Sequence, residues 1–141
     1  MPNEATPVPG EELSVRIRQD VDIVDARQQG RARAVAIGFT GSDLTLIATV
    51  ISELGRNILT YAQRGEIVLA TVERAGRKGI QVIARDQGPG IADIALAMQD
   101  GYSTSNSLGL GLPGTRRLMD EFDLVSTVGQ GTTVTVRKWV K

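Results

Sequence analysis

The stretch DQGPGIADI, Asp86 to Ile94, places an acidic residue and two glycines where a predicted strand gives way to a predicted helix. It follows GIQVIARD (residues 79–86), whose alternating apolar residues predict a half-buried strand. Asp86 therefore ends a strand, and Gly88 and Gly90 follow closely. A carboxylate there can accept a hydrogen bond from an exocyclic amine such as that of adenine, and the glycines let a flat ring or a phosphate approach the backbone. Turn chemistry between a strand and a helix explains the same residues, so both interpretations stand at this point.

Composition excludes several kinds of chemistry. The 141 residues suit one domain with a core, and 41% are apolar and 23% charged. Lys and Arg total 16, as do Asp and Glu, so no net charge favours nucleic acid or an anionic membrane. The lack of Cys and His excludes disulfides, zinc sites, thiol nucleophiles and imidazole bases. A metal would have to be a hard cation such as Mg²⁺ on oxygen ligands.

The N-terminal residues are expected to form a flexible extension. MPNEATPVPG is polar and rich in proline, and it has neither the basic start nor the apolar centre of a signal peptide. No apolar run approaches the roughly 20 residues of a membrane span. We therefore expect a cytoplasmic protein with an extension over residues 1–12 and one domain over residues 13–141.

The remaining pattern predicts an α+β fold. Strands are expected over residues 13–19, over residues 66–86 as two strands joined at AGRKG, and over residues 124–140 as a hairpin turning at Gly129–Gly131. Helices are expected over residues 22–37 with Asp22 as N-cap, 44–61 capped by Ser42 or Asp43, 92–99 and 115–122. The order β-α-α-β-β-α-loop-α-β-β favours a mixed, mainly antiparallel sheet with helices on one face.

Glu53 and Asn57 lie four residues apart in the helix expected over residues 44–61. The apolar stripe of that helix comprises Ile47, Val50, Ile51, Leu54 and Ile58. Both polar residues fall roughly a quarter turn from the centre of the stripe, where side chains can point into a cleft. An Asn oxygen can ligate Mg²⁺, and a Glu can accept a proton from an attacking hydroxyl. A solvated helix flank accounts for the same two residues.

GLGLPG, Gly109 to Gly114, follows the polar stretch STSNS (residues 103–107). Its formal match to G-x-G-x-x-G does not indicate a dinucleotide fold, because that fingerprint follows a strand in a βαβ unit. P-loop and eukaryotic-type kinase motifs do not occur. What remains is a glycine-rich loop that leads into a helix expected from Thr115, and its N–H groups can bind phosphate. The hydroxyl groups that can add donors belong to Ser103, Thr104, Ser105 and Ser107. A linker and a lid over a site both fit this loop.

The Gly131–Thr132 pair completes a fixed order of motifs: E-x-x-x-N, D-x-G-x-G, G-x-G-x-x-G and G-T. This order resembles the GHKL ATPases, which include gyrase, Hsp90, MutL and the histidine kinases, and it implies their Bergerat-type ATP-binding sandwich. A short chain without His is similar to the small serine kinases of bacterial sigma-factor switches. Residues 86–122, 21–39 and 51–62 resemble the RsbT-type switch kinases of the stressosome. The resemblance spans roughly Leu13 to Trp139.

The resemblance implies a role for each motif. Asn57 would hold a Mg²⁺ that bridges the ATP phosphates, and Glu53 would take the proton from the substrate serine or threonine. Asp86 would read the adenine amine, helped through water by Thr132. The residues implied to line the adenine pocket are Gly88 and Gly90, and those implied in the lid over the phosphates are Thr104, Ser105, Gly109, Leu110, Gly111 and Gly114. Arg116 and Arg117 follow the lid and are candidates to stabilise the transferring charge.

The resemblance also implies protein partners. The substrates would be STAS-domain stressosome proteins, and the released kinase would activate a PP2C-type phosphatase or another output protein. Relatives with this fold often pair, so a homodimer is compatible with it. Two alternatives stand beside this hypothesis: an anti-sigma factor kinase that binds a sigma factor, and a non-catalytic binding module regulated by ATP. GLGLPGTRRLMDEF (residues 109–122) favours the RsbT type, and the presence of both Glu53 and Asn57 favours catalysis, because binding alone needs no base.

Overall fold

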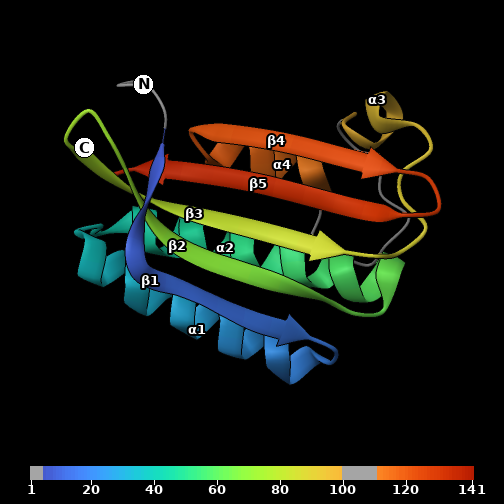
Figure 1. Ribbon diagram of the computed structural model, residues 1–141, viewed down its shortest axis with the longest axis horizontal. Helices are drawn as coiled ribbons and strands as arrows, with labels where there is room; N and C mark the ends of the chain where they lie inside the picture. Colours follow the sequence, from blue (N-terminus) through green and yellow to red (C-terminus); the bar gives the residue numbers. More distant parts are fainter. Residues whose placement is uncertain (1–4, 100–110) are drawn as a thin grey trace.

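A single antiparallel sheet forms one layer of the computed structural model, which describes residues 5–99 and 111–141. The strand order is β1-β2-β3-β5-β4. The strands are β1 (Thr6–Ile17), β2 (Gly65–Arg74), β3 (Arg77–Asp86), β4 (Glu121–Thr127) and β5 (Gly131–Trp139). The helices α1 (Asp20–Ile37), α2 (Ser42–Asn57) and α4 (Gly111–Leu118) lie on one face of the sheet, and the short α3 (Ile94–Ala97) lies at one end (Figure 1). The expected element order and the single helical face are confirmed.

The expectation of a mixed sheet was wrong in one respect. All four described strand pairs are antiparallel. The connection from β1 to β2 passes through two helices, so the chain returns to the end of the sheet where β1 finished and β2 runs back beside it. β4 runs in the same direction as β3, but β5 is inserted between them and pairs antiparallel with both.

The first strand begins earlier than expected. Thr6 and Pro7 pair with Glu73 and Val72 of β2, and the register then shifts before Glu12. The part of the expected extension from Thr6 onward therefore belongs to the sheet. This is compatible with its prolines because β1 is an edge strand, where a residue without an N–H group can be accommodated.

The ends of the first two helices differ from those predicted. α1 begins at Asp20 after Gln19 as N-cap, and the carboxylate of Asp22 accepts hydrogen bonds from the N–H groups of Arg18 and Gln19 at 2.9 and 3.1 Å. Asp22 thus closes the first turn from inside the helix. α2 begins at Ser42 after Gly41, so neither Ser42 nor Asp43 is its N-cap.

The two later helices are shorter than predicted or displaced. The expected helix over residues 92–99 is reduced to α3, whose N-cap Asp93 accepts a hydrogen bond from Leu96 N–H at 3.0 Å. The helix expected from Thr115 already includes Gly111 and ends at Leu118. Phe122 instead lies in β4 opposite Val136 and packs on the core, because a strand there places its ring against the sheet's buried face.

Glycines set the distance between α1 and α2. A side chain at Gly30 of α1 would overlap Ile51 of α2, and one at Gly55 of α2 would press on Ile23 of α1 at 3.0 Å. The two helices therefore pack closely on each other and on the core side chains of β1, β2 and β3. This packing holds the C-terminal end of α2 beside the end of β3, where the candidate site lies.

Candidate functional site

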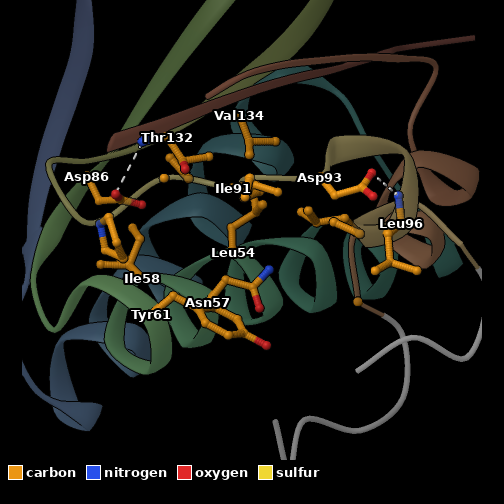
Figure 2. Close-up of a pocket in the computed structure, with 17 residues that line it drawn as sticks. Leu54, Asn57, Ile58, Tyr61, Asp86, Ile91, Asp93, Leu96, Thr132 and Val134 are labelled. Atoms are coloured by element: carbon orange, nitrogen blue, oxygen red, sulfur yellow. Dashed lines mark hydrogen bonds between the residues drawn. The ribbon is translucent and has the colours of Figure 1, made fainter. Parts of the chain in front are cut away.

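A cavity of about 470 Å³ lies between the end of α2, the DQGPG turn, α3, the start of α4 and strands β3 and β5. Its volume is within the range of small-molecule sites. Figure 2 shows Asp86 and Thr132 toward one end of it and Asn57 nearer its middle. The lining residues are Leu54, Asn57, Ile58, Tyr61, Ala84, Asp86, Pro89, Gly90, Ile91, Ala92, Asp93, Leu96, Ala97, Gly111, Leu112, Thr132 and Val134. Mostly apolar walls with a few polar groups are typical of a site for a flat, partly polar ligand.

Asp86 is the last residue of β3 and lies opposite Thr132 in the ladder with β5. Its Oδ1 accepts hydrogen bonds from the N–H groups of Gly88 and Thr132, at 2.9 and 3.3 Å. Within the described residues, the hydrogen bonds of this carboxylate all fall on Oδ1. Two main-chain donors therefore fix the carboxylate, while Oδ2 is available to a ligand in the cavity (Figure 2).

The glycines beside Asp86 are required by close packing between two turns. A side chain at Gly131 would overlap the carbonyl oxygen of Asp86, and one at Gly90 would overlap that of Thr127. Gly129 N–H donates to Pro89 C=O at 2.8 Å and joins the β4–β5 turn to the DQGPG turn. Gly90 lines the cavity, whereas Gly88 packs against Ala62. These residues therefore allow the two turns to pack closely, and Gly90 also forms part of the cavity wall.

Asn57 and Glu53 occupy different positions relative to the cavity. Asn57 ends α2 and lines the cavity. Glu53, one helical turn earlier, is only 2% exposed and is absent from the lining. Its Oε2 has no hydrogen-bond partner among the described residues. A solvated helix flank therefore does not describe Glu53, and an unpaired buried carboxylate oxygen is a costly arrangement.

The chain continues past Asn57 as a π-helical turn, Ile58–Ala62, which ends at Gln63 with a left-handed φ of 70°. Such turns are frequent at functional sites. Here the turn contributes Ile58 and Tyr61 to the cavity wall. The sequence pattern predicted a continuous helix over these residues, and the spacing of three residues between Ile58 and Tyr61 is compatible with their lying on one side of it.

The predicted residues of the glycine-rich segment fall partly at the start of α4 and partly outside the described residues. Gly111 lines the cavity together with Leu112, whereas Gly114 is buried within α4. Arg116 and Arg117 are exposed and do not line the cavity. Thr104, Ser105, Gly109 and Leu110 lie outside the described residues.

Other residues of the site were missed because their role depends on tertiary contacts. The apolar walls from Ile91, Leu96 and Val134 come from three separate segments. Ser126 of β4, which sequence analysis did not single out, accepts a hydrogen bond from Ile91 N–H at 2.7 Å and lies 2.8 Å from Thr132 Oγ1. The sequence feature that could have indicated Ser126 is the alternation of side chains along the last hairpin. Ser126 pairs with Thr132 there, so the two side chains lie on the same face of the sheet.

A second acidic residue lies at the opposite end of the sheet. Glu121 begins β4. The hydrogen bond from the Arg74 guanidinium, with further ones from Trp139 and Arg137, lowers the pKa of Glu121 to about 2, although partial burial opposes this.

In the part of the chain that is described, no helix has both the length and the apolar character needed to cross a membrane.

Comparison with known proteins agrees with this geometry. Residues 42–141 match the family of histidine kinase-, DNA gyrase B-, and HSP90-like ATPases. The serine/threonine-protein kinase RsbT of Bacillus subtilis is 53% identical over 127 residues, which are 90% of this chain and 96% of that protein. The anti-sigma F factor of a Thermoanaerobacter species is 31% identical over 120 residues, 82% of this chain and 83% of that protein.

A solved structure shares the fold. The crystal structure of the RsbU and RsbW domains of a Mycobacterium tuberculosis protein superposes with a TM-score of 0.58 at 24% identity. The match covers 92% of this chain but only 32% of that longer one. The ATPase match over residues 42–141 and the near full-length similarity to RsbT show the family. The chain therefore belongs to the GHKL ATPases and, within them, to the RsbT type of serine/threonine-protein kinases.

Proposed function

We propose that this chain uses Mg-ATP to phosphorylate a serine or threonine of a STAS-domain stressosome protein. The observation that carries this proposal is the pair formed by Glu53 and Asn57: a buried carboxylate with an unpaired oxygen, one helical turn from an amide that lines the cavity. Binding alone would not require such a carboxylate. The similarity to RsbT supports the choice of a protein hydroxyl as acceptor.

Adenine is proposed to occupy the end of the cavity at Asp86. Oδ2 of Asp86 would accept a hydrogen bond from the exocyclic amine, and Thr132 would contact the neighbouring ring nitrogen directly or through water. Ile58, Ile91 and Val134 offer apolar surface for the faces of the ring. Asp86 would select adenine because a base without the amine leaves the carboxylate unpaired.

The phosphates are proposed to lie near Asn57 and the start of α4. The residues present fit a Mg²⁺, because Asn57 lines the cavity, its amide oxygen is a hard ligand, and the phosphates can supply further oxygens. The cation would neutralise phosphate charge. Main-chain N–H groups at the start of α4 and in the adjoining glycine-rich segment are further candidates to bind the phosphates, as are Thr104, Ser105, Gly109, Leu110, Gly111 and Gly114.

Glu53 is proposed to be the base. Its carboxylate would accept the proton of the substrate hydroxyl while the hydroxyl oxygen bonds to the γ-phosphorus and the bond to the β,γ-bridging oxygen breaks, which releases ADP. Arg116 or Arg117 of α4 would stabilise the transferring charge.

After transfer, the kinase is proposed to leave its substrate and activate an output protein such as a PP2C-type phosphatase, in the cytoplasm and either as a monomer or as a homodimer. The anti-sigma F factor similarity keeps one alternative, a kinase that binds a sigma factor. The higher identity to RsbT favours the first proposal. Co-elution with the sigma factor of the same cell would favour the alternative.

The test is a phosphotransfer assay. Purified protein, γ-labelled Mg-ATP and the STAS-domain protein of the same cell are mixed, with Glu53→Gln and Glu53→Ala as variants. We expect label on the STAS protein to fall by about 10²–10⁴-fold in both variants, while the affinity for ATP changes little. Glu66→Gln, which changes an acid on the outer face of the sheet, is the matched control and should transfer normally.

Each result separates one part of the proposal from the others. Transfer that survives in Glu53→Gln would exclude Glu53 as the base. Binding of ATP by the wild-type protein without any transfer would favour the binding module regulated by ATP. Co-elution of the two unlabelled proteins in that case would show that the partner was correct.

A further inference from the structure

Ser126 connects the two turns that form the Asp86 end of the cavity. Its Oγ accepts a hydrogen bond from Ile91 N–H at 2.7 Å, and it lies 2.8 Å from Thr132 Oγ1 and 3.3 Å from Gly131 C=O. Ser126 is half-buried and does not line the cavity, whereas Thr132, its partner in the β4–β5 ladder, does. Ser126 therefore acts on the cavity only through Thr132 and the main chain.

The hydrogen bonds of Ser126 can be assigned from its three neighbours. A hydroxyl has one proton to donate and two lone pairs. One lone pair is occupied by Ile91 N–H. The proton can go to Thr132 Oγ1 at 2.8 Å, the usual O–H···O length, or to Gly131 C=O at 3.3 Å, which is long for such a bond. The shorter contact is the better acceptor.

If Ser126 donates to Thr132, the proton of the Thr132 hydroxyl is free to turn toward the cavity. If Ser126 donated to Gly131 instead, Thr132 would have to donate to Ser126 and would present only lone pairs to a ligand. The direction of this one bond therefore decides whether the cavity holds a donor or an acceptor beside the Asp86 carboxylate.

We propose that Ser126 is a positioning residue that orients the Thr132 hydroxyl as a donor, and that this makes the site selective for adenine. Adenine presents an amine donor at C6 and an acceptor at N1, which match an acceptor from Asp86 and a donor from Thr132. Hypoxanthine and guanine present a carbonyl at C6 and N1–H, so both interactions would be reversed. The inference rests on the proposed placement of ATP in this cavity.

The experiment compares two nucleotides on a small set of variants. Isothermal titration measures the Kd of Mg-ATP and of Mg-inosine triphosphate for the wild-type protein, Ser126→Ala, Ser126→Thr and Asp86→Asn. Ser14→Ala is the matched control, because it removes a strand hydroxyl that bonds Glu66, and neither residue lines the cavity. Thermal unfolding of each variant without nucleotide records any general loss of stability.

We expect the wild-type protein to prefer ATP, and Ser126→Ala to reduce the ratio of the two Kd values by about tenfold, the value of one ordinary hydrogen bond. Ser126→Thr keeps the hydroxyl and should restore the ratio, and Ser14→Ala should leave it unchanged. A merely structural role for Ser126 would weaken both nucleotides equally, since Ile91 N–H loses its acceptor in either complex.

Three results would overturn the inference. If the ratio of the two Kd values in Ser126→Ala equals that of the wild-type protein, Thr132 is oriented without Ser126. An equal loss for both nucleotides shows that Ser126 only supports the turns. A wild-type protein that binds both nucleotides alike, with no effect of Asp86→Asn, shows that adenine is not read at this end of the cavity, and the proposed site then fails together with the inference.

Discussion

Asp86 and Glu121 are two carboxylates on one sheet, and they differ in how many of their oxygens are hydrogen-bonded. Asp86 ends β3 on the helical face, and among the described residues its hydrogen bonds come from main-chain N–H groups to Oδ1. Glu121 begins β4 at the other end of the sheet, and both of its oxygens are bonded. Arg74 donates to Oε1 and Oε2, Arg137 donates to Oε1 at 3.1 Å, and Trp139 Nε1 donates to Oε2 at 2.6 Å.

The difference separates a structural acid from one that is available to a ligand. Glu121 has little capacity left for another donor, so its bonds contribute to stability, and the Arg74 guanidinium also stacks on the Trp139 ring at 4.7 Å. Asp86 is held in place yet keeps one oxygen toward the cavity. Loss of Glu121 should therefore affect folding, and loss of Asp86 should affect binding.

Of these two carboxylates, the larger effect is expected from Asp86→Asn. Asn keeps an oxygen for Gly88 N–H and Thr132 N–H, but an NH2 donor replaces the charged oxygen Oδ2 that would accept the adenine amine. We expect ATP affinity to fall by about 10–100-fold, because a hydrogen bond to a charged group contributes about 1.5–3 kcal/mol, while the melting temperature without nucleotide changes little. Isothermal titration and thermal unfolding measure the two quantities. A large loss of stability with normal ATP affinity would reverse the assignment.

A smaller effect, on stability alone, is expected from Glu121→Gln. The substitution leaves Arg74 and Arg137 without their carboxylate partner, although both are partly exposed and water can solvate them. We expect the free energy of unfolding to fall by about 1–2 kcal/mol with unchanged ATP affinity. Glu66→Gln is the control, since its pair with Arg85 is more exposed and should contribute less. Urea unfolding that ranks the two variants in the other order would contradict this.

The smallest and most specific effect concerns pH. The pKa of Glu121 is lowered from 4.5 to about 2, chiefly by the hydrogen bond from Arg74. Because the pKa is lower in the folded state, the contribution of Glu121 is present above pH 4.5 and is lost as the pH falls toward 2. The stability difference between the wild-type protein and Glu121→Gln should therefore shrink over that range. Urea unfolding of both proteins between pH 7 and low pH measures it, and parallel curves would show that Glu121 is not the titrating group.

Much of the fold was predictable because local patterns agree with the final packing. The apolar stripe of α2, the alternation of β2 and β3, and the glycines of the last hairpin each indicate one type of element, and these elements are present. Helix ends were less predictable. Ser42 and Asp43 both have suitable side chains for an N-cap, yet Gly41 takes that position. Phe122 continues a helical pattern, but burial against Val136 places it in a strand.

The sequence by itself determined the order of elements, the family and the positions of Glu53, Asn57, Asp86 and Thr132, because those depend on residue type and spacing along the chain. Only the tertiary structure decided which of them share a cavity, that Glu53 is buried beside it, and that Ser126 reaches Thr132. It also brought Arg74 to Glu121, 47 residues away. The physical reason is that a hydrogen bond or a cavity wall depends on distances in space, which are set when the sheet aligns its strands and the helices pack against it.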